Sequence, residues 1–150
     1  LLALAILLGC GISSCTYKKG STTMAQQELN FKDFTAINAN HGIELEITQG
    51  AEYSVSVSAP ENYMDNLKIE QEGETLYVSL VNKGKRLLDT DDITVHITMP
   101  YISQIDLAGA AEACFQAPQF TAHLSGSSNI EDLTVVADEV SIEATGASEV

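Results

Sequence analysis

Apolar and polar residues alternate along most of the chain from residue 43 onward. In residues 43–48 three aliphatic side chains alternate with three polar ones, which is the period of a strand with one buried face. The alternation resumes in residues 53–59 after the turn Gln49-Gly50-Ala51-Glu52, so we predict a hairpin. Pro60 ends this hairpin, and residues 61–66 are expected to form one short helical turn, the only helix after the N-terminal segment.

A second hairpin is predicted from residues 67–72 and 75–81, which alternate in the same way on either side of the Gly73-Glu74 turn. A polar loop over residues 82–92 follows. Residues 93–99 then place apolar side chains at the odd positions and polar ones at the even positions, and Pro100 ends this strand. The central part of the chain is therefore predicted to consist of half-buried strands.

After Pro100 a short sequence unit recurs, starting at about residue 101. Residues 105–113 align with 122–130 and with 142–150, and each unit has a glycine among small residues, at Gly109, Gly126 and Gly146. Glycine adopts positive φ at little cost, so these are predicted to be sharp repeat turns. Coils this short cannot bury an apolar face alone and are expected to stack.

The predicted fold class is all-β, with N-terminal hairpins leading into a right-handed, single-stranded β-helix (β-solenoid). A β-sandwich with similar Gly-Ala-Ser turns is the alternative. Because the chain starts with Leu1 and stops inside the third repeat, we expect it to be truncated at both ends, with further coils beyond residue 150.

Five features of residues 34–150 occur together in a characteristic order. They are Phe34-Thr35-Ala36-Ile37, the strand 41–47 with its Gln49-Gly50 turn, the break Ala59-Pro60-Glu61-Asn62, the strand end Ile97-Thr98-Met99-Pro100, and the recurring Gly-Ala-Ser turns. In these the chain resembles the putative auto-transporter adhesin, head GIN domain family of envelope lipoproteins from Gram-negative bacteria. The resemblance implies an all-β fold ending in a β-helix and an adhesin role, and it brings no catalytic residues. The chain departs from the family in stopping early and in having Ala108 and Ala111 where Ser is more usual.

The first 15 residues have the pattern of a lipoprotein signal segment with a lipobox. The apolar run over residues 1–8 is too short to span a bilayer permanently, which takes about 20 residues, but suits a secretory signal. Lipidation is predicted at Cys15, which follows two serines, with Cys10 as the alternative; ordinary buried cysteines or a disulfide are the other interpretation. Residues 16–27 are predicted to be a flexible tether, and residues 28–150 a single domain.

The charge of the chain excludes one class of partner. There are 21 acidic against 7 basic residues, a net charge of −14, and no Lys or Arg follows Arg86. Nucleic-acid binding requires cationic groups that displace counterions from phosphates, so no nucleic acid is expected as a partner. The same shortage of cations disfavours phosphate or uronate substrates, and the acidity is interpreted as a self-repelling surface.

Candidate chemistry is sparse, and we expect no enzyme and no cofactor. No two of the three histidines are close in sequence, and none has zinc-ligand spacing; His96 and His123 are predicted to face solvent. Cys114 is interpreted as a small buried residue. Asp89, Asp91 and Asp92 form the one candidate cation site, although a solvated turn is the preferred interpretation.

The expected function is that of a cell-envelope lipoprotein with a non-catalytic, adhesin-like or scaffolding domain. A carbohydrate-binding or carbohydrate-active β-helix is the alternative. The predicted contacts are the outer membrane, through the lipid anchor, and an envelope protein or glycan that meets Ser125, Ser127, Ser128, Asn129 and Thr145 at the turns. The segment 16–19 lacks the acidic residues that direct surface export in some lineages, which favours a periplasm-facing orientation.

Overall fold

The structure is a computed structural model that describes residues 17–40, 43–81, 86–88, 92–108, 110–116, 119–126 and 128–148. In these ranges the chain is mostly β-structure, as predicted, with one 3-10 helix, η1 (Glu61–Asn66). The strands are β1 (Tyr17–Lys19), β2 (Met24–Leu29), β3 (Ala36–Asn40), β4 (Glu44–Gln49), β5 (Ser54–Pro60), β6 (Leu67–Glu72), β7 (Thr75–Leu80), β8 (Arg86–Leu88), β9 (Thr94–Met99), β10 (Gln104–Ala108), β11 (Ala110–Gln116), β12 (Gln119–Leu124), β13 (Asn129–Val136) and β14 (Glu139–Ala144).

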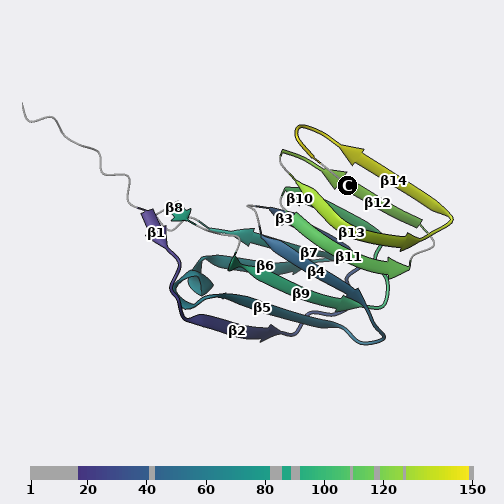
Figure 1. The fold of residues 1–150 in the computed structure, drawn as a ribbon. Helices are drawn as coiled ribbons and strands as arrows, with labels where there is room; N and C mark the ends of the chain where they lie inside the picture. The colour runs from purple at the N-terminus through teal and green to yellow at the C-terminus, as the bar shows by residue number, and fades with distance from the viewer. Residues whose placement is uncertain are drawn as a thin grey trace, which may run out of the picture.

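Two six-stranded sheets make up the body of the molecule (Figure 1). Sheet I has the order β14-β12-β10-β3-β7-β6, and sheet II has the order β13-β11-β4-β9-β5-β2. Strands β13 and β14 lie at one end of this stack and β2 lies toward the other (Figure 1). Strands β1 and β8 form a separate two-stranded sheet.

From β10 onward the chain alternates between the sheets. Strands β10, β12 and β14 pair in parallel in sheet I, whereas β11 and β13 pair in parallel in sheet II. Each passage through both sheets is one coil, and each coil lies against the previous one. The same arrangement continues below, where β3 and β4 pair in parallel with β10 and β11 on one side and with β7 and β9 on the other.

The register in sheet I agrees with the sequence repeat before each turn. Ile105 stands opposite Ala122, and Ala122 stands opposite Ile142, as the aligned repeats predict. After the first turn the alignment is wrong by two residues, because Ala111 stands opposite Ile130 and not opposite Ser128. The turn at Gly126 is longer, and the shifted register places Ile130 in the core, where it is 3% exposed.

The first predicted hairpin is wrong in its pairing. Strand β9 lies between β4 and β5, parallel to β4 and antiparallel to β5. Alternation fixes which side chains of a strand face the core, but it does not identify the neighbouring strand. The second hairpin is confirmed, with β6 antiparallel to β7 around Gly73 at φ 59°, and the helical turn over residues 61–66 is confirmed as η1.

The predicted tether over residues 16–27 also needs correction. Strand β2 starts at Met24 and pairs antiparallel with β5 as far as Leu29, and the Ser21 backbone N–H donates to the Asn62 side chain of η1 at 2.8 Å. The ordered domain thus begins before Glu28. The sequence hides this strand because an edge strand is held mainly by backbone hydrogen bonds and can remain polar.

Inward-facing aliphatic side chains form ladders that run from coil to coil. Leu76, Ile37, Ile105 and Ala122 stand in register across β7, β3, β10 and β12, and each is 0% exposed. Burying a large aliphatic side chain contributes about 1.5–3 kcal/mol, so each ladder binds the coils together. In β14 the ladder continues with Ile142, which is 43% exposed.

The turns after β12 and β14 are stacked as well. Gly126 and Gly146 have φ values of 74° and 81°, and the backbone N–H of Ala147 donates to the carbonyl of Gly126 at 2.8 Å. A Cβ atom on Gly146 would lie 2.7 Å from that carbonyl oxygen. Glycine is therefore needed at position 146 both for its conformation and for the close approach of the turn beneath it.

We expect the loss of stability on shortening an aliphatic side chain to depend on whether its strand lies between two other strands or beside only one. Ile105→Ala should lower the free energy of unfolding by about 2–5 kcal/mol, because it leaves a cavity between coils. Ile142→Ala, the matched control in the same register, should cost only about 1 kcal/mol because its side chain is already partly hydrated. Urea denaturation of the purified variants measures both values, and equal losses would contradict the stacking order.

A second pair of variants tests the stacked turns. Gly126→Ala should cost about 1–2 kcal/mol because of its positive φ; in the described part of the chain nothing lies within 4 Å of its new Cβ atom. Gly146→Ala should cost more, about 2–4 kcal/mol, because it also drives two turns apart. The rate of hydrogen exchange at the Ala147 amide measures how much each substitution destabilises the stacked turns. A smaller destabilisation by Gly146→Ala than by Gly126→Ala would refute the stacking.

Candidate functional site

The outer face of sheet I carries a row of polar and aromatic side chains that crosses the strands. In β7, β3, β10 and β12 these residues lie between two core residues, as Asp106 lies between Ile105 and Leu107 and Tyr77 lies between Leu76 and Val78. The cross-strand register then brings the outward residues together. In spatial order this cross-strand row consists of Glu70, Tyr77, Asn38, Asp106, His123 and Glu143.

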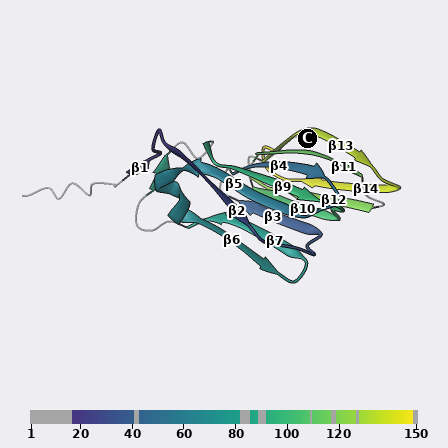
Figure 2. The ribbon, with the colours of Figure 1, turned by 90° about the horizontal axis from the view of Figure 1, so that it is seen from below.

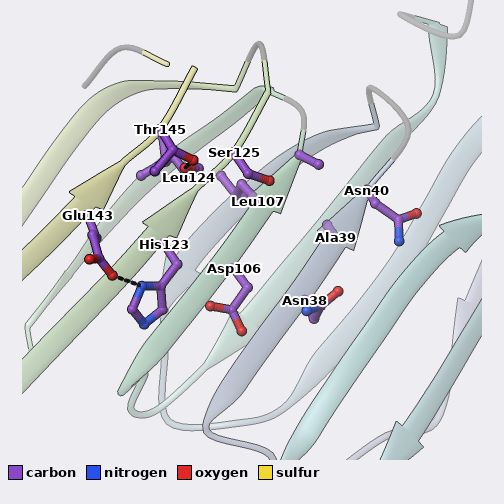
Figure 3. A pocket seen from close by; sticks show the side chains of 11 residues that line it. Asn38, Ala39, Asn40, Asp106, Leu107, His123, Leu124, Ser125, Glu143 and Thr145 are labelled. Carbon is purple, nitrogen blue, oxygen red and sulfur yellow. Dashed lines mark hydrogen bonds and ion pairs between the residues drawn. The ribbon is translucent and has the colours of Figure 1, made fainter. Parts of the chain in front are cut away.

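Two adjoining hollows follow this row. One has a volume of about 370 Å³ and is lined by residues that include Asn38, Asn40, Asp106, His123 and Glu143 (Figure 3). The other has a volume of about 280 Å³ and lies on the side of β6 and β7, where Lys68, Glu70, Glu72 and Tyr77 line it. Both hollows share Asn38 and Asn40, so we describe them together as the trough.

Side chains in the trough are held by neighbours on the same face. The Asp106 carboxylate accepts two hydrogen bonds from the Gln104 amide, at 3.1 and 2.9 Å. The imidazole Nδ1 of His123 lies 3.3 Å from a carboxylate oxygen of Glu143 (Figure 3). These contacts fix the direction in which Asp106 and His123 present their polar atoms, which lowers the entropic cost of binding a ligand.

Lys68 is the one Lys or Arg side chain that lines the trough in the described part of the chain. Its ammonium group lies 2.8 Å from a carboxylate oxygen of Glu70. The hydrogen bond to Glu70 and the negative charge of Glu70 raise the pKa of Lys68 above its usual value, with a smaller contribution from the charge of Glu72. Lys68 therefore stays charged at neutral pH and is engaged by an acid, so the trough is acidic overall.

Most of the site residues predicted from the sequence lie outside the described residues: Cys10, Cys15, Asp89, Asp91 and Gly109. Asp92 is described and is exposed. Within the described ranges no three His, Cys, Asp or Glu side chains are grouped so that they could hold a metal ion. The cation site at Asp89, Asp91 and Asp92 stays a prediction.

His96 and His123 both face solvent, as predicted, with side chains 45% and 47% exposed. His96 lies on the outer face of sheet II, 2.6 Å from a Glu46 carboxylate oxygen. Each histidine thus pairs with a glutamate on the neighbouring strand, one pair on each sheet. Of these two histidines, only His123 lies in the trough beside other polar groups.

One of the predicted display residues is buried. Ser128 is 1% exposed, and its hydroxyl lies within hydrogen-bonding distance of the Leu107 carbonyl at 2.8 Å and of the Ser125 carbonyl. The same Leu107 carbonyl accepts a hydrogen bond from the Ser125 backbone N–H at 3.0 Å, so Ser128 adds a second contact that fastens one coil to the previous one and is not displayed to a partner. Ser125 and Thr145 are exposed and line the trough.

Sequence reasoning missed Tyr77 and Asn38 as site residues. The surface predicted to meet a partner was placed at the turns of the repeats after Pro100, whereas Tyr77 precedes Pro100 and is 39% exposed. The sequence could have indicated that Tyr77 faces solvent, because it occupies an outward position of the alternating strand, between the buried Leu76 and Val78. Its proximity to Asp106 depends on the order of β7, β3 and β10, which local sequence does not specify.

A separate, smaller groove is lined mainly by apolar side chains. It has a volume of about 210 Å³ and is lined by residues of β2, β5, η1 and β6, among them Leu29, Met64, Leu67 and Ile69. Seen from below, η1 lies at one end of these strands (Figure 2). As for membrane insertion, the described residues contain no helix that is both long enough and apolar enough to cross a bilayer.

Solved structures of low sequence identity share the fold. The "putative adhesin" of Bacteroides fragilis superposes with a TM-score of 0.73 at 16% identity, over 87% of this chain and 62% of that one. The "putative adhesin" of Parabacteroides distasonis gives 0.72 at 14% identity, over 88% and 57%. A "putative lipid binding protein" of Parabacteroides distasonis gives 0.72 at 19% identity, over 87% and 59%. This chain thus spans about three-fifths of the length of those proteins, and comparison with curated proteins finds no match.

The sequence profile of one protein family covers nearly the whole described domain. The family described as "Putative auto-transporter adhesin, head GIN domain" matches residues 33–150. Neither this description nor the names of the similar structures specify an enzyme. The resemblance inferred from the sequence is confirmed, and the chain belongs to the putative auto-transporter adhesin, head GIN domain family.

Proposed function

We propose that this protein is a cell-envelope lipoprotein whose β-domain acts as a non-catalytic, adhesin-like or scaffolding module. The observation that carries the proposal is the family match over residues 33–150. It is supported by the polar trough, which offers a broad surface for a partner and is built on the six-stranded sheet I. The net charge of −14 repels the phosphates of nucleic acid, so we do not propose nucleic acid as a partner.

The proposed architecture of the second half is a right-handed β-helix. The parallel pairing of β10, β12 and β14, with the chain crossing to sheet II between them, is what such coils require. Parallel strands joined by a crossover are right-handed in about 98% of cases, which supports this hand. A β-helix suits an interaction module, because its coils repeat one outer surface along a single axis.

The proposed anchor is a lipid on Cys15, or on Cys10 as the alternative. The apolar run before these residues has the character of a secretory signal. The residues before Ser21 would then connect the anchor to the domain, which is attached to η1 from Ser21 onward. We propose the outer membrane as the location and the periplasm as the side that the domain faces.

The catalytic alternative is a glycoside hydrolase that uses two carboxylates of the trough. Asp106 and Glu143 are two strands apart, or about 9–10 Å at the usual strand spacing, which is close to the range of about 6.5–9.5 Å for inverting carboxylate pairs. The general acids of such enzymes lie in dry pockets, whereas the Glu143 side chain is 77% exposed. The exposure of this group supports binding without turnover.

Lipid binding, named for one similar structure, is not favoured for this chain. The apolar groove beside η1 has a volume of about 210 Å³, below the roughly 300–1,000 Å³ of typical small-molecule sites. Carbohydrate binding is the second candidate that an observation favours, because the exposed Tyr77 lies in the trough with amide and carboxylate groups.

The anchor predicts that one cysteine carries the lipid. Cys15→Ser in the protein expressed with its natural N-terminal sequence should abolish incorporation of an alkyne-tagged fatty acid and release the domain from the membrane fraction. Cys10→Ser is the matched control and should leave both properties unchanged. The reverse result would assign the anchor to Cys10, and labelling that survives the double substitution would refute a lipidated cysteine.

Orientation is tested on the same cells. A periplasm-facing domain should resist proteinase K in intact cells and become degraded once the outer membrane is permeabilised. Degradation in intact cells, with a periplasmic marker protein still protected, would place the domain on the cell surface instead.

A further inference from the structure

We propose that the trough on sheet I binds a neutral oligosaccharide that lies across the strands, with Tyr77 as its stacking platform. This inference rests on the interaction role proposed above and names the partner of the same face. Three properties of the trough carry it: an exposed aromatic ring, oriented polar groups in a row, and an acidic charge balance.

The aromatic platform is Tyr77 on β7. The residue is 39% exposed, while both neighbours in the strand, Leu76 and Val78, are 0% exposed. The buried neighbours fix the strand and leave the tyrosine on the outer face. The face of an aromatic ring is negatively polarised and attracts weakly positive C–H groups, which pyranose rings present on one side. Tyrosine also loses little conformational entropy when it is covered, because it has only two side-chain torsions.

Hydrogen-bonding groups follow the ring along the row. Asn38, directly opposite Tyr77 on β3, has an amide that can both donate and accept. Asp106 comes next, and its carboxylate is oriented by the two hydrogen bonds from Gln104. His123 and Glu143 complete the row on β12 and β14. Sugars carry pairs of hydroxyl groups on adjacent carbons, and a carboxylate or amide can bind both members of such a pair.

The length of the row suits a chain of sugars better than a single one. From Tyr77 to Glu143 the row crosses β7, β3, β10, β12 and β14. At about 4.8 Å per strand interval these positions span roughly 19 Å. The hollows of about 370 and 280 Å³ lie along this line and share Asn38 and Asn40, so one extended ligand can occupy both.

The charge balance selects a neutral glycan over an acidic one. Glu70, Glu72, Asp106 and Glu143 line the trough, and the Lys68 ammonium group is engaged by Glu70 at 2.8 Å. An acidic polysaccharide would therefore be repelled along the whole row.

A protein partner is less well matched to this surface than a glycan. Protein interfaces depend on clusters of buried apolar and aromatic anchors. In the described part of the chain, Tyr77 is the only exposed large apolar side chain that lines the trough, and the others, Met24, Val81, Val140 and Ile142, lie elsewhere. The polar row offers hydrogen bonds to a hydroxylated chain instead.

The test is isothermal titration calorimetry of the full chain, purified in detergent, against neutral hexasaccharides of glucose, mannose and xylose, with hexagalacturonate as the acidic comparison. We expect at least one neutral hexasaccharide to bind and hexagalacturonate to bind much more weakly. Tyr77→Ala should weaken binding about tenfold through the loss of stacking, whereas Tyr77→Phe should retain it.

Two further variants locate the site. His123→Ala should weaken binding, and His96→Ala is the matched control, because it has the same kind of glutamate pair on the other sheet. Circular dichroism and thermal unfolding check that each variant is folded. Binding that Tyr77→Ala leaves unchanged, or that His96→Ala weakens as much as His123→Ala, overturns the assignment of the site.

The remaining outcomes separate this inference from the proposed function. If no neutral hexasaccharide binds at millimolar concentration, the glycan proposal is wrong while the lipid anchor and its tests are unaffected. Equal binding of hexagalacturonate overturns the charge argument. Release of new reducing ends during the titration overturns the non-catalytic role itself.

Discussion

Hydrogen bonding between parallel strands of successive coils is the interaction on which the rest of the structure depends. It places Ile37, Ile105 and Ala122 one above another, so the aliphatic side chains that a single coil would expose are buried between its neighbours. The register is strict, because a shift by one residue would turn Ile105 outward and Asp106 into the core. Burial of the ladder therefore also decides which polar residues face solvent.

The same constraint explains how the fold can persist while the sequence changes. Similar structures share it at 14 to 19% identity, because stacking requires only aliphatic residues in the inward phase and tight turns at the ends. The outward phase is free to vary. In this chain it carries Tyr77, Asn38 and Asp106 on sheet I, so the outer surface can change without a change in the core.

The parts of the structure that local patterns determine could be predicted from the sequence. Alternation predicted strands at 43–48, 67–72 and 93–99 with their inward faces, and the structure has them at 44–49, 67–72 and 94–99. It could not predict that β9 separates β4 from β5, since that choice depends on distant strands. It missed β2, whose backbone pairing needs few apolar residues, and it placed Ser128 at the surface because nothing local shows its contact with Leu107. The trough could not be predicted either, because Tyr77, Asn38 and Asp106 become neighbours only through the order of the strands in sheet I.

Strand β14 shows what the ladder offers to a neighbouring strand. Within the described part of the chain β14 pairs with β12 alone, and its Val140 and Ile142 are 47% and 43% exposed. Ile142 stands in register with Ala122 and Ile105, which are 0% exposed and have a paired strand on either side. A further strand added in parallel to β14 would bury Ile142 in the same way, so the column of strands can be lengthened without a new kind of contact.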